Sequence, residues 1–464
     1  MTNIAHVLVA GFRLAVGKGN DFMFKLINYP AKTEARGFYS NLLLAFPHII
    51  FCAIFILFLS GCVFKELKKE VAILDQTSIL QGTISSPSSH KKPLVVLLYQ
   101  ILKNEKKLVA YSIHHRPGTF TFIRLPGQYL IASFEDENED FIYQSTEYAN
   151  YIDNPRVLTL KPGKDIVSLD LRLKHPDDVT ISEWPNLTSP ATRATLDLPK
   201  ISAGEIVTLE DQRFSPKNAQ HGLWRPILFL QNVGGGVFFL EPFDPAKIPI
   251  VFVHGVGGNP QQWTSLIHHL DRIRYQPWIF YYPSGLRLHM NADFLIQSLS
   301  EILVKNKFKK LVVIAHSMGG LVSRSLINTI VEKDVELKFR VLFVTLSTPW
   351  GGHQAAQIGV DHAPAVIPSW IDMIPNSPFQ QTLFQTRLSD HIEYYLFFSF
   401  KGGHNPFTNG NDDGTVSLLS QLKTEAQDAA IKTIGFNEDH TSILRAPHAI
   451  EKIEALLTTF ADRD

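Results

Sequence analysis

The chain has 464 residues, enough for two or three domains at roughly 100–200 residues each. Hydrophobic residues make up 45% of it and charged residues 19%, a balance that is typical of globular proteins and excludes disorder as the default. Lys and Arg together number 44, as do Asp and Glu, so the formal net charge is zero. A neutral chain lacks the basic field that holds a phosphate backbone, and no nucleic-acid partner is expected.

An apolar stretch near the N-terminus, residues 42–59, contains no Asp, Glu, Lys or Arg and follows a basic lead. This pattern indicates a secretory signal. The stretch ends in Leu59-Ser60-Gly61-Cys62, which resembles the lipobox of bacterial lipoproteins. The resemblance implies that Cys62 carries lipid and becomes the first residue of the mature chain. Loss of the preceding residues would remove Cys52, the other cysteine, and leave no thiol for a disulfide.

Residues 1–62 are therefore interpreted as a signal or lipoprotein segment, or alternatively as an uncleaved transmembrane anchor, since the apolar stretch is just long enough to span a bilayer. Either way the rest of the chain is expected to be exported and tethered to a membrane. Val63 stands where many inner-membrane lipoproteins have Asp, which favours the bacterial outer membrane.

Residues 76–175 are predicted to form a small all-β domain. Runs such as 94–98 and 118–123 are apolar or β-branched and are bounded by Pro, Gly and Ser. The segment beginning Pro126-Gly127-Gln128-Tyr129 resembles a strand of transthyretin-like and carboxypeptidase-regulatory β-sandwiches. That resemblance implies a module for binding or spacing rather than for chemistry. A stretch rich in Pro, Asp, Ser and Thr, residues 176–200, then predicts a linker.

From residue 201 to residue 464 apolar strands alternate with helical patterns. Two strands that look antiparallel, 205–209 and 236–240, lead into this region. Unbroken apolar strands separated by helices predict a mostly parallel sheet with helices on both faces, an α/β fold. The expected strands are 248–253, 278–282, 310–315, 340–346, 394–400 and 431–436, and the expected helices are 261–270, 292–304, 318–331 and 449–460.

The strongest motif is Ala315-His316-Ser317-Met318-Gly319, at the end of the strand expected over 310–315 and the start of a helix. It matches the nucleophile elbow G-x-S-x-G, except that Ala315 replaces the first Gly. A sharp strand-to-helix turn lifts the serine hydroxyl above the sheet, and only small neighbours leave room for that backbone. The helix N-terminus adds free N–H groups and a positive dipole. Ser317 is therefore predicted to be a nucleophile.

A second glycine-rich turn, residues 254–258, follows the strand expected over 248–253. It resembles the His-Gly loop of α/β-hydrolases, which supplies one N–H of the oxyanion hole while the residue after the nucleophile supplies the other. This resemblance implies Val256 and Met318 as the two donors. The alternative, a phosphate-binding loop, is disfavoured because no Gly-Lys-Ser/Thr follows.

In this fold the triad acid comes after the nucleophile and before the histidine. Asp413 precedes Gly414 and Val416 in a turn that resembles the acid turn of lipases, and it follows the strand expected over 394–400. A carboxylate here would hold an imidazole in one tautomer and stabilise its protonated form. Asp413 is the predicted acid, and Asp412 is its main alternative.

His440 lies in the loop after the strand expected over 431–436 and before the last helix, where this fold places its general base. His448 is the alternative, but its place at a helix start favours capping or packing. Three further histidines are expected to line the site or its rim: His316, His353 and His404.

Together these motifs resemble bacterial lipases and esterases of the α/β-hydrolase fold, including relatives of the PGAP-type inositol deacylases, over residues 200–464. The resemblance includes the stretch 347–352, where Trp350 stands in place of a histidine common in lipases. It implies a membrane-tethered serine carboxylic ester hydrolase that acts on lipid-like or other apolar acyl esters without a metal or organic cofactor. The alternatives are an acyltransferase, thioesterase or amidase on the same triad, and a non-enzymatic adhesion or scaffold protein that works through the β-sandwich.

The insertion between the strands expected over 340–346 and 394–400 is too long for a simple connection. Its centre, residues 364–375, is apolar and broken by prolines. Long loops in compact domains are often functional lids, and an apolar lid would suit an apolar acyl chain. A packed cap without motion is the alternative.

The lipobox interpretation makes a prediction about Cys62. Metabolic labelling with a fatty acid in the bacterial host should mark the protein, and Cys62→Ser should lose the label. The acyl chains, at about 0.8 kcal/mol per buried CH₂, would hold the protein at the bilayer. An unlabelled protein with an intact N-terminus upstream of Leu42 would favour the transmembrane anchor instead.

Overall fold

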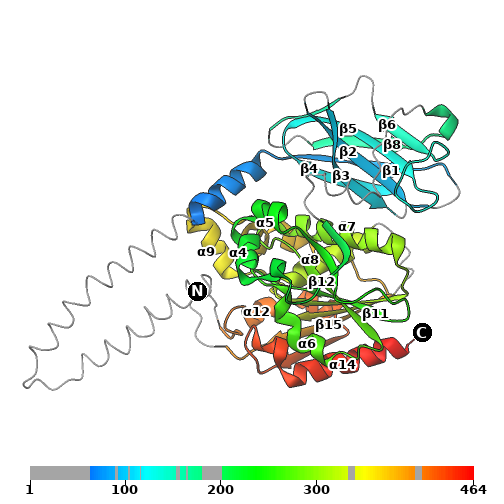
Figure 1. Cartoon of the computed structure of the whole chain (residues 1–464). Helices are drawn as coiled ribbons and strands as arrows, with labels where there is room; N and C mark the ends of the chain where they lie inside the picture. Colours follow the sequence, from blue (N-terminus) through cyan, green and yellow to red (C-terminus); the bar gives the residue numbers. More distant parts are fainter. Residues whose placement is uncertain are drawn as a thin grey trace, which may run out of the picture. The chain divides into compact units, whose positions relative to one another are not determined.

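The computed structural model describes the chain from residue 63 to residue 463, and Figure 1 shows its course. The segment expected to be a signal or anchor, residues 1–62, and most of the linker predicted over 176–200 lie outside the described residues. Among the residues that are described, no helix is both long enough and apolar enough to cross a bilayer. The gaps within the described range are 89–91, 103–104, 115–116, 153–156, 163–165, 180–200, 333–339 and 403–409.

The β-rich region expected over 76–175 is confirmed, and its strands form two sheets. One sheet has the order β4-β1-β8, with β1 antiparallel to β4 and parallel to β8. The other has the order β3-β2-β5-β6, and β7 also pairs with β5. Leu80 and Phe120 of the first sheet share a buried cluster with Leu98 and Ile131 of the second. The bounds are β1 (Ser78–Ser85), β2 (Leu94–Leu102), β3 (Glu105–His114), β4 (Gly118–Arg124), β5 (Gly127–Glu135), β6 (Ala149–Ile152), β7 (Leu158–Leu160) and β8 (Ile166–Arg172).

The region from residue 201 onward contains one eight-stranded sheet with the order β16-β15-β14-β13-β11-β12-β10-β9. β10 is antiparallel to β12, and the other neighbouring strands are parallel. The mostly parallel sheet predicted from the sequence is confirmed. The bounds are β9 (Ile201–Ile206), β10 (Gly235–Phe239), β11 (Ile248–Val253), β12 (Tyr275–Tyr281), β13 (Lys310–His316), β14 (Arg340–Leu346), β15 (Ile392–Ser399) and β16 (Lys432–Phe436).

The prediction for the first two strands of this sheet was wrong in one respect. β9 and β10 are parallel neighbours, not antiparallel ones. Two helices, α4 (Pro216–Trp224) and α5 (Pro226–Asn232), connect them. A helical connection of this length can return the chain to the same end of the sheet, which a tight hairpin cannot do.

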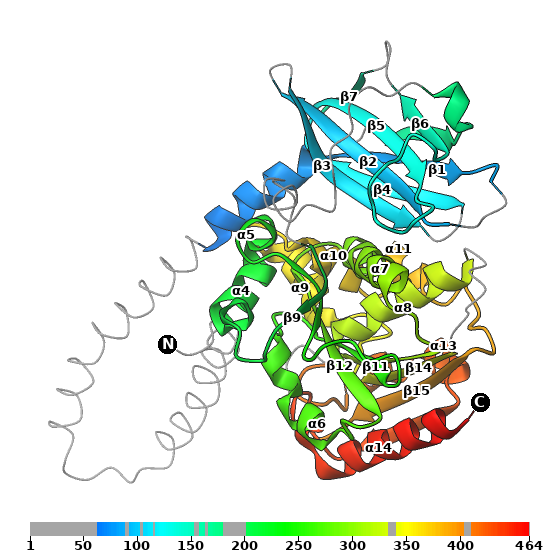
Figure 2. The ribbon, with the colours of Figure 1, turned by 45° about the vertical axis from the view of Figure 1, so that its right-hand side comes forward.

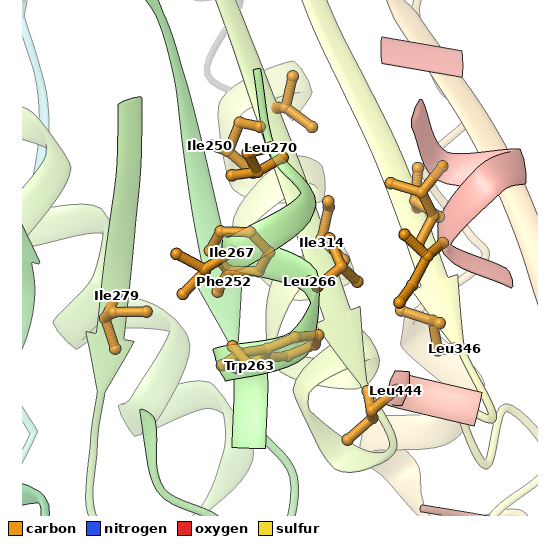
Figure 3. Packing of buried hydrophobic residues seen from close by; sticks show 14 of the residues in the cluster. Ile250, Phe252, Trp263, Leu266, Ile267, Leu270, Ile279, Ile314, Leu346 and Leu444 are labelled. Carbon is orange, nitrogen blue, oxygen red and sulfur yellow. The ribbon is translucent and has the colours of Figure 1, made fainter. Parts of the chain in front are cut away.

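Helices cover both faces of the sheet, as Figures 1 and 2 show. Alternate residues of the strands enter two separate cores: Ile250 and Phe252 of β11 lie in one, and Val251 and Val253 lie in the other. Figure 3 shows the first core, where Trp263 packs beside the strands. Burial on both faces explains why these strands are apolar without interruption. The first core also includes residues of α6 (Thr264–His269) and α14 (Pro447–Asp462), and the second includes residues of α7 (Leu288–Lys305), α8 (Met318–Glu332) and α13 (Thr424–Ala429).

The helix over residues 63–75 precedes β1 in the chain but packs on the helices that follow β9. Leu67 is fully buried in a small cluster with Leu223 of α4 and Ile367. The Glu70 carboxylate accepts hydrogen bonds from the backbone N–H groups of Ile227 at 2.7 Å and Leu228 at 3.3 Å. These residues form the first turn of α5, whose own N-cap residue makes no side-chain capping bond. Glu70 thus stabilises the start of α5.

The long insertion after β14 folds into three helices, α9 (Gln354–His362), α10 (Pro368–Met373) and α11 (Pro378–Thr382), here called the cap. Asp372 of α10 is buried and accepts hydrogen bonds from the Arg287 guanidinium at 2.6 and 2.9 Å and from Leu288 N at 2.7 Å. Ser369 N donates to Gly285 O at 3.0 Å. Leu288 is the first residue of α7, so Asp372 also caps that helix. These bonds favour the packed cap over a mobile lid.

Replacing Asp372 should test this attachment. Asp372→Asn should lower the free energy of unfolding by about 2 kcal/mol, because a charged hydrogen-bond acceptor is lost beside buried donors. Denaturant unfolding of the two proteins measures the difference. Asp361→Asn is the matched control, since Asp361 is exposed on α9 and its side chain contacts Gln357 of the same helix. It should stay within about 0.5 kcal/mol of the parent, and equal losses in both variants would contradict the role given to Asp372.

Candidate active site

Ser317 occupies the turn between β13 and α8 with a φ of 54°. A positive φ is unfavourable for any residue with a side chain, so the surrounding structure has to hold this backbone in place. Ser317 N donates to Leu346 O at 2.9 Å, and Gly320 N donates to Ser317 O at 3.0 Å. A Cβ on Gly255 would lie 2.8 Å from the Ser317 Cβ, and one on Gly319 would lie 2.5 Å from His254 O. The close approach explains why small residues surround this serine.

The structure brings Ser317, His440 and Asp413 together although they are far apart in the sequence. The Ser317 Oγ lies 2.9 Å from His440 Nε2, and His440 Nδ1 lies 2.7 Å from Asp413 Oδ2. A carboxylate can only accept, so the ring carries its proton on Nδ1 and leaves Nε2 as the acceptor for the Ser317 hydroxyl. All three side chains are buried or nearly so. This is the geometry of a nucleophile, a base and an orienting acid.

The Asp413 carboxylate is fully buried yet well supplied with donors. Its Oδ1 accepts from Thr415 N at 3.0 Å and from Val416 N at 2.7 Å. Burial alone would raise the pKa of Asp413, but the neighbouring His440 and the hydrogen bonds outweigh it and lower that pKa. A depressed pKa in the folded state means that Asp413 adds stability above its unfolded pKa. That contribution is lost as the pH falls through the folded pKa.

Two further histidines, His316 and His254, are buried near Ser317, His440 and Asp413. His316 Nε2 lies 2.7 Å from the backbone oxygen of His440, and burial lowers the pKa of His316 to about 3. The neutral ring therefore donates from Nε2 and fixes the loop that carries His440. His254 stacks on Tyr282 with ring centroids 4.2 Å apart, and burial lowers its pKa to about 4. Both rings are structural supports at neutral pH.

The predicted oxyanion donors occupy the two backbone segments next to Ser317. Met318 is the first residue of α8, where N–H groups have no partner within the helix. Val256 follows Gly255, the glycine packed against the Ser317 side chain. The Ser284 hydroxyl accepts from Gly257 N at 2.9 Å and holds this loop. The roles of the Val256 and Met318 N–H groups as oxyanion donors stay predictions.

The alternatives for base and acid, His448 and Asp412, make their recorded side-chain contacts elsewhere in the described residues. The His448 side chain is 90% exposed and lies 3.4 Å from Glu451 at the start of α14. Asp412 Oδ1 accepts from Gly414 N at 2.8 Å, a local turn contact. His353 is partly buried, its Nδ1 accepts from Ala355 N to cap α9, and desolvation lowers its pKa. His404 lies outside the described residues.

Sequence reasoning missed two residues that contact the Asp413 carboxylate. Ser399, the last residue of β15, donates from Oγ to Asp413 Oδ2 at 2.9 Å. Gln421, the last residue of α12 (Leu418–Gln421), donates from Nε2 to the same oxygen at 3.1 Å. No motif in the chain marks either residue. Within the described part of the chain, no group of three or more His, Cys, Asp or Glu is placed to hold a metal ion.

The places of the three side chains in the sheet decide the fold of this region. Ser317 follows β13, Asp413 follows β15 and His440 follows β16, so all three lie beyond the C-terminal ends of parallel strands. The chain order of serine, acid and histidine and the strained serine turn complete the pattern. The eight-stranded sheet and the helices around it have the α/β-hydrolase fold. The fold class predicted from the sequence is confirmed.

Within the α/β-hydrolase region, residues 246–373 match a protein family described as "Putative serine esterase (DUF676)". The matched segment contains Ser317 and the Gly255 loop, and Asp413 and His440 lie beyond its end. The match supports a serine hydrolase. No match to the chain was found among curated proteins.

Several solved structures are similar to the chain. Lipase BlEst2 of Bacillus licheniformis, in its mature form, is 20% identical over 48% of this chain and 97% of its own, with a TM-score of 0.38. The lin2722 product of Listeria innocua is 16% identical over 46% of this chain and 94% of its own, with a TM-score of 0.36. Phospholipase PlaB of Legionella pneumophila, in complex with thio-NAD, is 14% identical over 38% of this chain and 44% of its own, with a TM-score of 0.32.

The geometry around Asp413 predicts which of two adjacent aspartates matters for turnover. Asp413→Asn should lower turnover by up to ~10⁴-fold, because an amide favours the wrong tautomer of His440. Asp412→Asn should have a far smaller effect, since its carboxylate bonds within the turn. Rates of ester hydrolysis for the two variants give the comparison. If Asp412→Asn proves the more damaging change, the acid assignment moves by one residue.

Proposed function

We propose that this chain is a serine carboxylic ester hydrolase that uses Ser317 as nucleophile, His440 as general base and Asp413 as orienting acid. The observation that carries the proposal is the continuous set of hydrogen-bond distances, 2.9 Å from Ser317 Oγ to His440 Nε2 and 2.7 Å from His440 Nδ1 to Asp413 Oδ2, at a strained serine turn. Two of these groups could meet by packing alone. The three together, with the strain, are the arrangement that activates a hydroxyl.

In the proposed reaction, Ser317 Oγ attacks the ester carbonyl carbon while His440 Nε2 takes the hydroxyl proton. The carbonyl oxygen becomes negative and is held by the backbone N–H groups of Val256 and Met318; one such donor contributes about 10²–10³-fold in related sites. His440 then gives its proton to the leaving alcohol, and the acyl group stays on Ser317. Water attacks this acyl ester with His440 again as base, the acid leaves, and the proton returns to Ser317. No metal or organic cofactor takes part in these steps.

The proposed substrates are lipid-like or other apolar acyl esters. The apolar sequence at the centre of the cap, residues 364–375, supports this, since it would suit an apolar acyl chain. The proposed tether at Cys62 would place such a protein at a membrane surface in the bacterial outer membrane. The tether and the location are proposals from the sequence, since residues 1–62 lie outside the described residues.

Covalent labelling with a fluorophosphonate tests the proposed nucleophile. The parent protein should be labelled and Ser317→Ala should not be, because only an activated hydroxyl attacks the phosphorus at a useful rate. Ser323→Ala is the matched control, since Ser323 is a fully buried serine of the same helix α8. Its labelling should persist. Undiminished labelling of Ser317→Ala would remove the central proposal.

The acyl preference and the type of acyl bond need a second measurement. A panel of nitrophenyl esters of increasing acyl length should show turnover that rises with chain length if the site takes apolar acyl groups. The same protein assayed with thioesters, amides and alcohol acceptors separates ester hydrolysis from thioester hydrolysis, amide hydrolysis and acyl transfer, since the triad serves all of them. Labelled Ser317 with no ester turnover would overturn the ester assignment and leave the nucleophile in place.

A further inference from the structure

The side-chain amide of Gln421 has one orientation fixed by its surroundings. Its Oε1 lies 3.0 Å from Ser399 N, a group that can only donate. The oxygen must therefore face Ser399 N, and the Nε2 group faces the other way. There it lies 3.1 Å from Asp413 Oδ2, 3.0 Å from Ser399 O and 3.2 Å from Val416 O, all of which can only accept here. Gln421 is 1% exposed, so no water replaces these partners.

Ser399 adds a second donor to the same carboxylate oxygen, and its direction is also fixed. Its single hydroxyl proton goes to Asp413 Oδ2 at 2.9 Å. The Ser347 Oγ lies 2.6 Å from Ser399 Oγ, so Ser347 donates to Ser399. Ser347 has a φ of 53°, a strained backbone for a serine, and it lies directly after β14. The Ser347 hydroxyl thus donates to Ser399, and the Ser399 hydroxyl donates to the Asp413 oxygen that also accepts from His440.

Asp413 Oδ2 consequently accepts from three donors at once: His440 Nδ1, Ser399 Oγ and Gln421 Nε2. The last two compete with the imidazole for the negative charge of that oxygen, and they fix its direction. In a buried site such donors are worth more than they are in water. Removing either the Ser399 or the Gln421 donor would leave the Asp413 carboxylate freer to rotate. The carboxylate would also bind the Nδ1 proton of His440 more strongly.

We propose that Gln421, supported by Ser399 and Ser347, is a positioning residue that sets the direction and strength of the Asp413–His440 hydrogen bond. This inference rests on the proposed function, because it assigns a role within the same site. Gln421 acts through Asp413, and no contact joins it to Ser317. The amide carries no charge and does not titrate, so its effect on the pH dependence has to come through the pair that it adjusts.

Among the described residues, the titratable neighbours of this pair are His316 and His353 together with Asp412 and Asp439, which are adjacent to it in the sequence. His316 comes from the end of β13 and His353 precedes α9, and burial lowers the pKa of each. The lowered pKa favours the neutral ring in each case, and the Gln421 amide bonds to Asp413 directly. A shift of the pH profile on changing Gln421 can then be assigned to the Asp413–His440 pair.

The test is the rate of Ser317 phosphonylation by a fluorophosphonate, measured across pH on the whole protein. This rate depends on His440 as base and needs no knowledge of the natural substrate. Gln421→Met keeps the length of the side chain and removes the donors. It should lower the rate by about tenfold near neutral pH, a fraction of what a general base contributes, and move the acidic limb of the profile to higher pH. Ser399→Ala should move the limb in the same direction and serves if Gln421→Met does not fold.

Gln276→Met is the matched control. Gln276 is a fully buried glutamine of β12 whose amide contacts Asp244 N, Asp244 O and Lys247 O, at the N-terminal end of the strand and away from the triad. It should leave the pH profile unchanged even if it lowers stability. An equal rate loss at every pH in Gln421→Met, with no movement of the limb, would overturn the positioning role, as would a profile identical to the parent's. A parent protein that is not labelled at any pH would instead overturn the proposed function itself, and this inference with it.

Discussion

The backbone at Ser317 is the constraint on which the site depends. A serine with a φ of 54° carries strain of about 1–3 kcal/mol, which has to be offset by the structure around it. β13 supplies this by lying between β11 and β14 with its residues buried, so the strand cannot shift to relax the turn. The close contact with Gly255 and the bond to Leu346 O then fix both sides of the turn. The geometry of the site therefore depends on the packing at the centre of the sheet.

Around this turn, a buried carboxylate keeps its charge while neighbouring buried histidines are neutral. One carboxylate is buried with five donors directed at its two oxygens, while the buried rings of His254 and His316 are kept neutral by burial. Positive charge can therefore develop at His440 beside Asp413 without repulsion from its neighbours. Buried polar groups of this kind stabilise a single arrangement when all are satisfied and are costly when one is not.

Much of the fold and part of the site could be predicted because their signals are local. Apolar runs mark the buried strands, and small residues around Ser317 mark the turn. The direction of β9 relative to β10 could not be predicted, because the residue pattern of a strand does not show whether the connection after it returns the chain to the same end of the sheet. Ser399 and Gln421 escaped for a related reason: they meet Asp413 from 14 and 8 residues away, through the packing of β15 and α12, and neither has a distinctive sequence. The length of the insertion after β14 predicted a lid or a packed cap, but no sequence signal marks Asp372 as the residue that bonds to Arg287 and Leu288.

The helix over residues 63–75 precedes the β-rich region in the sequence but packs against helices that follow that region. Its Leu67 and Glu70 complete the surroundings of α4 and α5, although the whole β-rich region lies between them in the sequence. A fragment cut to begin at residue 201 would uncover Leu223 and Ile367 and leave the N–H groups of Ile227 and Leu228 without their carboxylate. The hydrolase region is thus assembled from two pieces of chain. During synthesis, the helix over residues 63–75 is made before α4 and α5, so its contacts with them can form only after those later helices have been made.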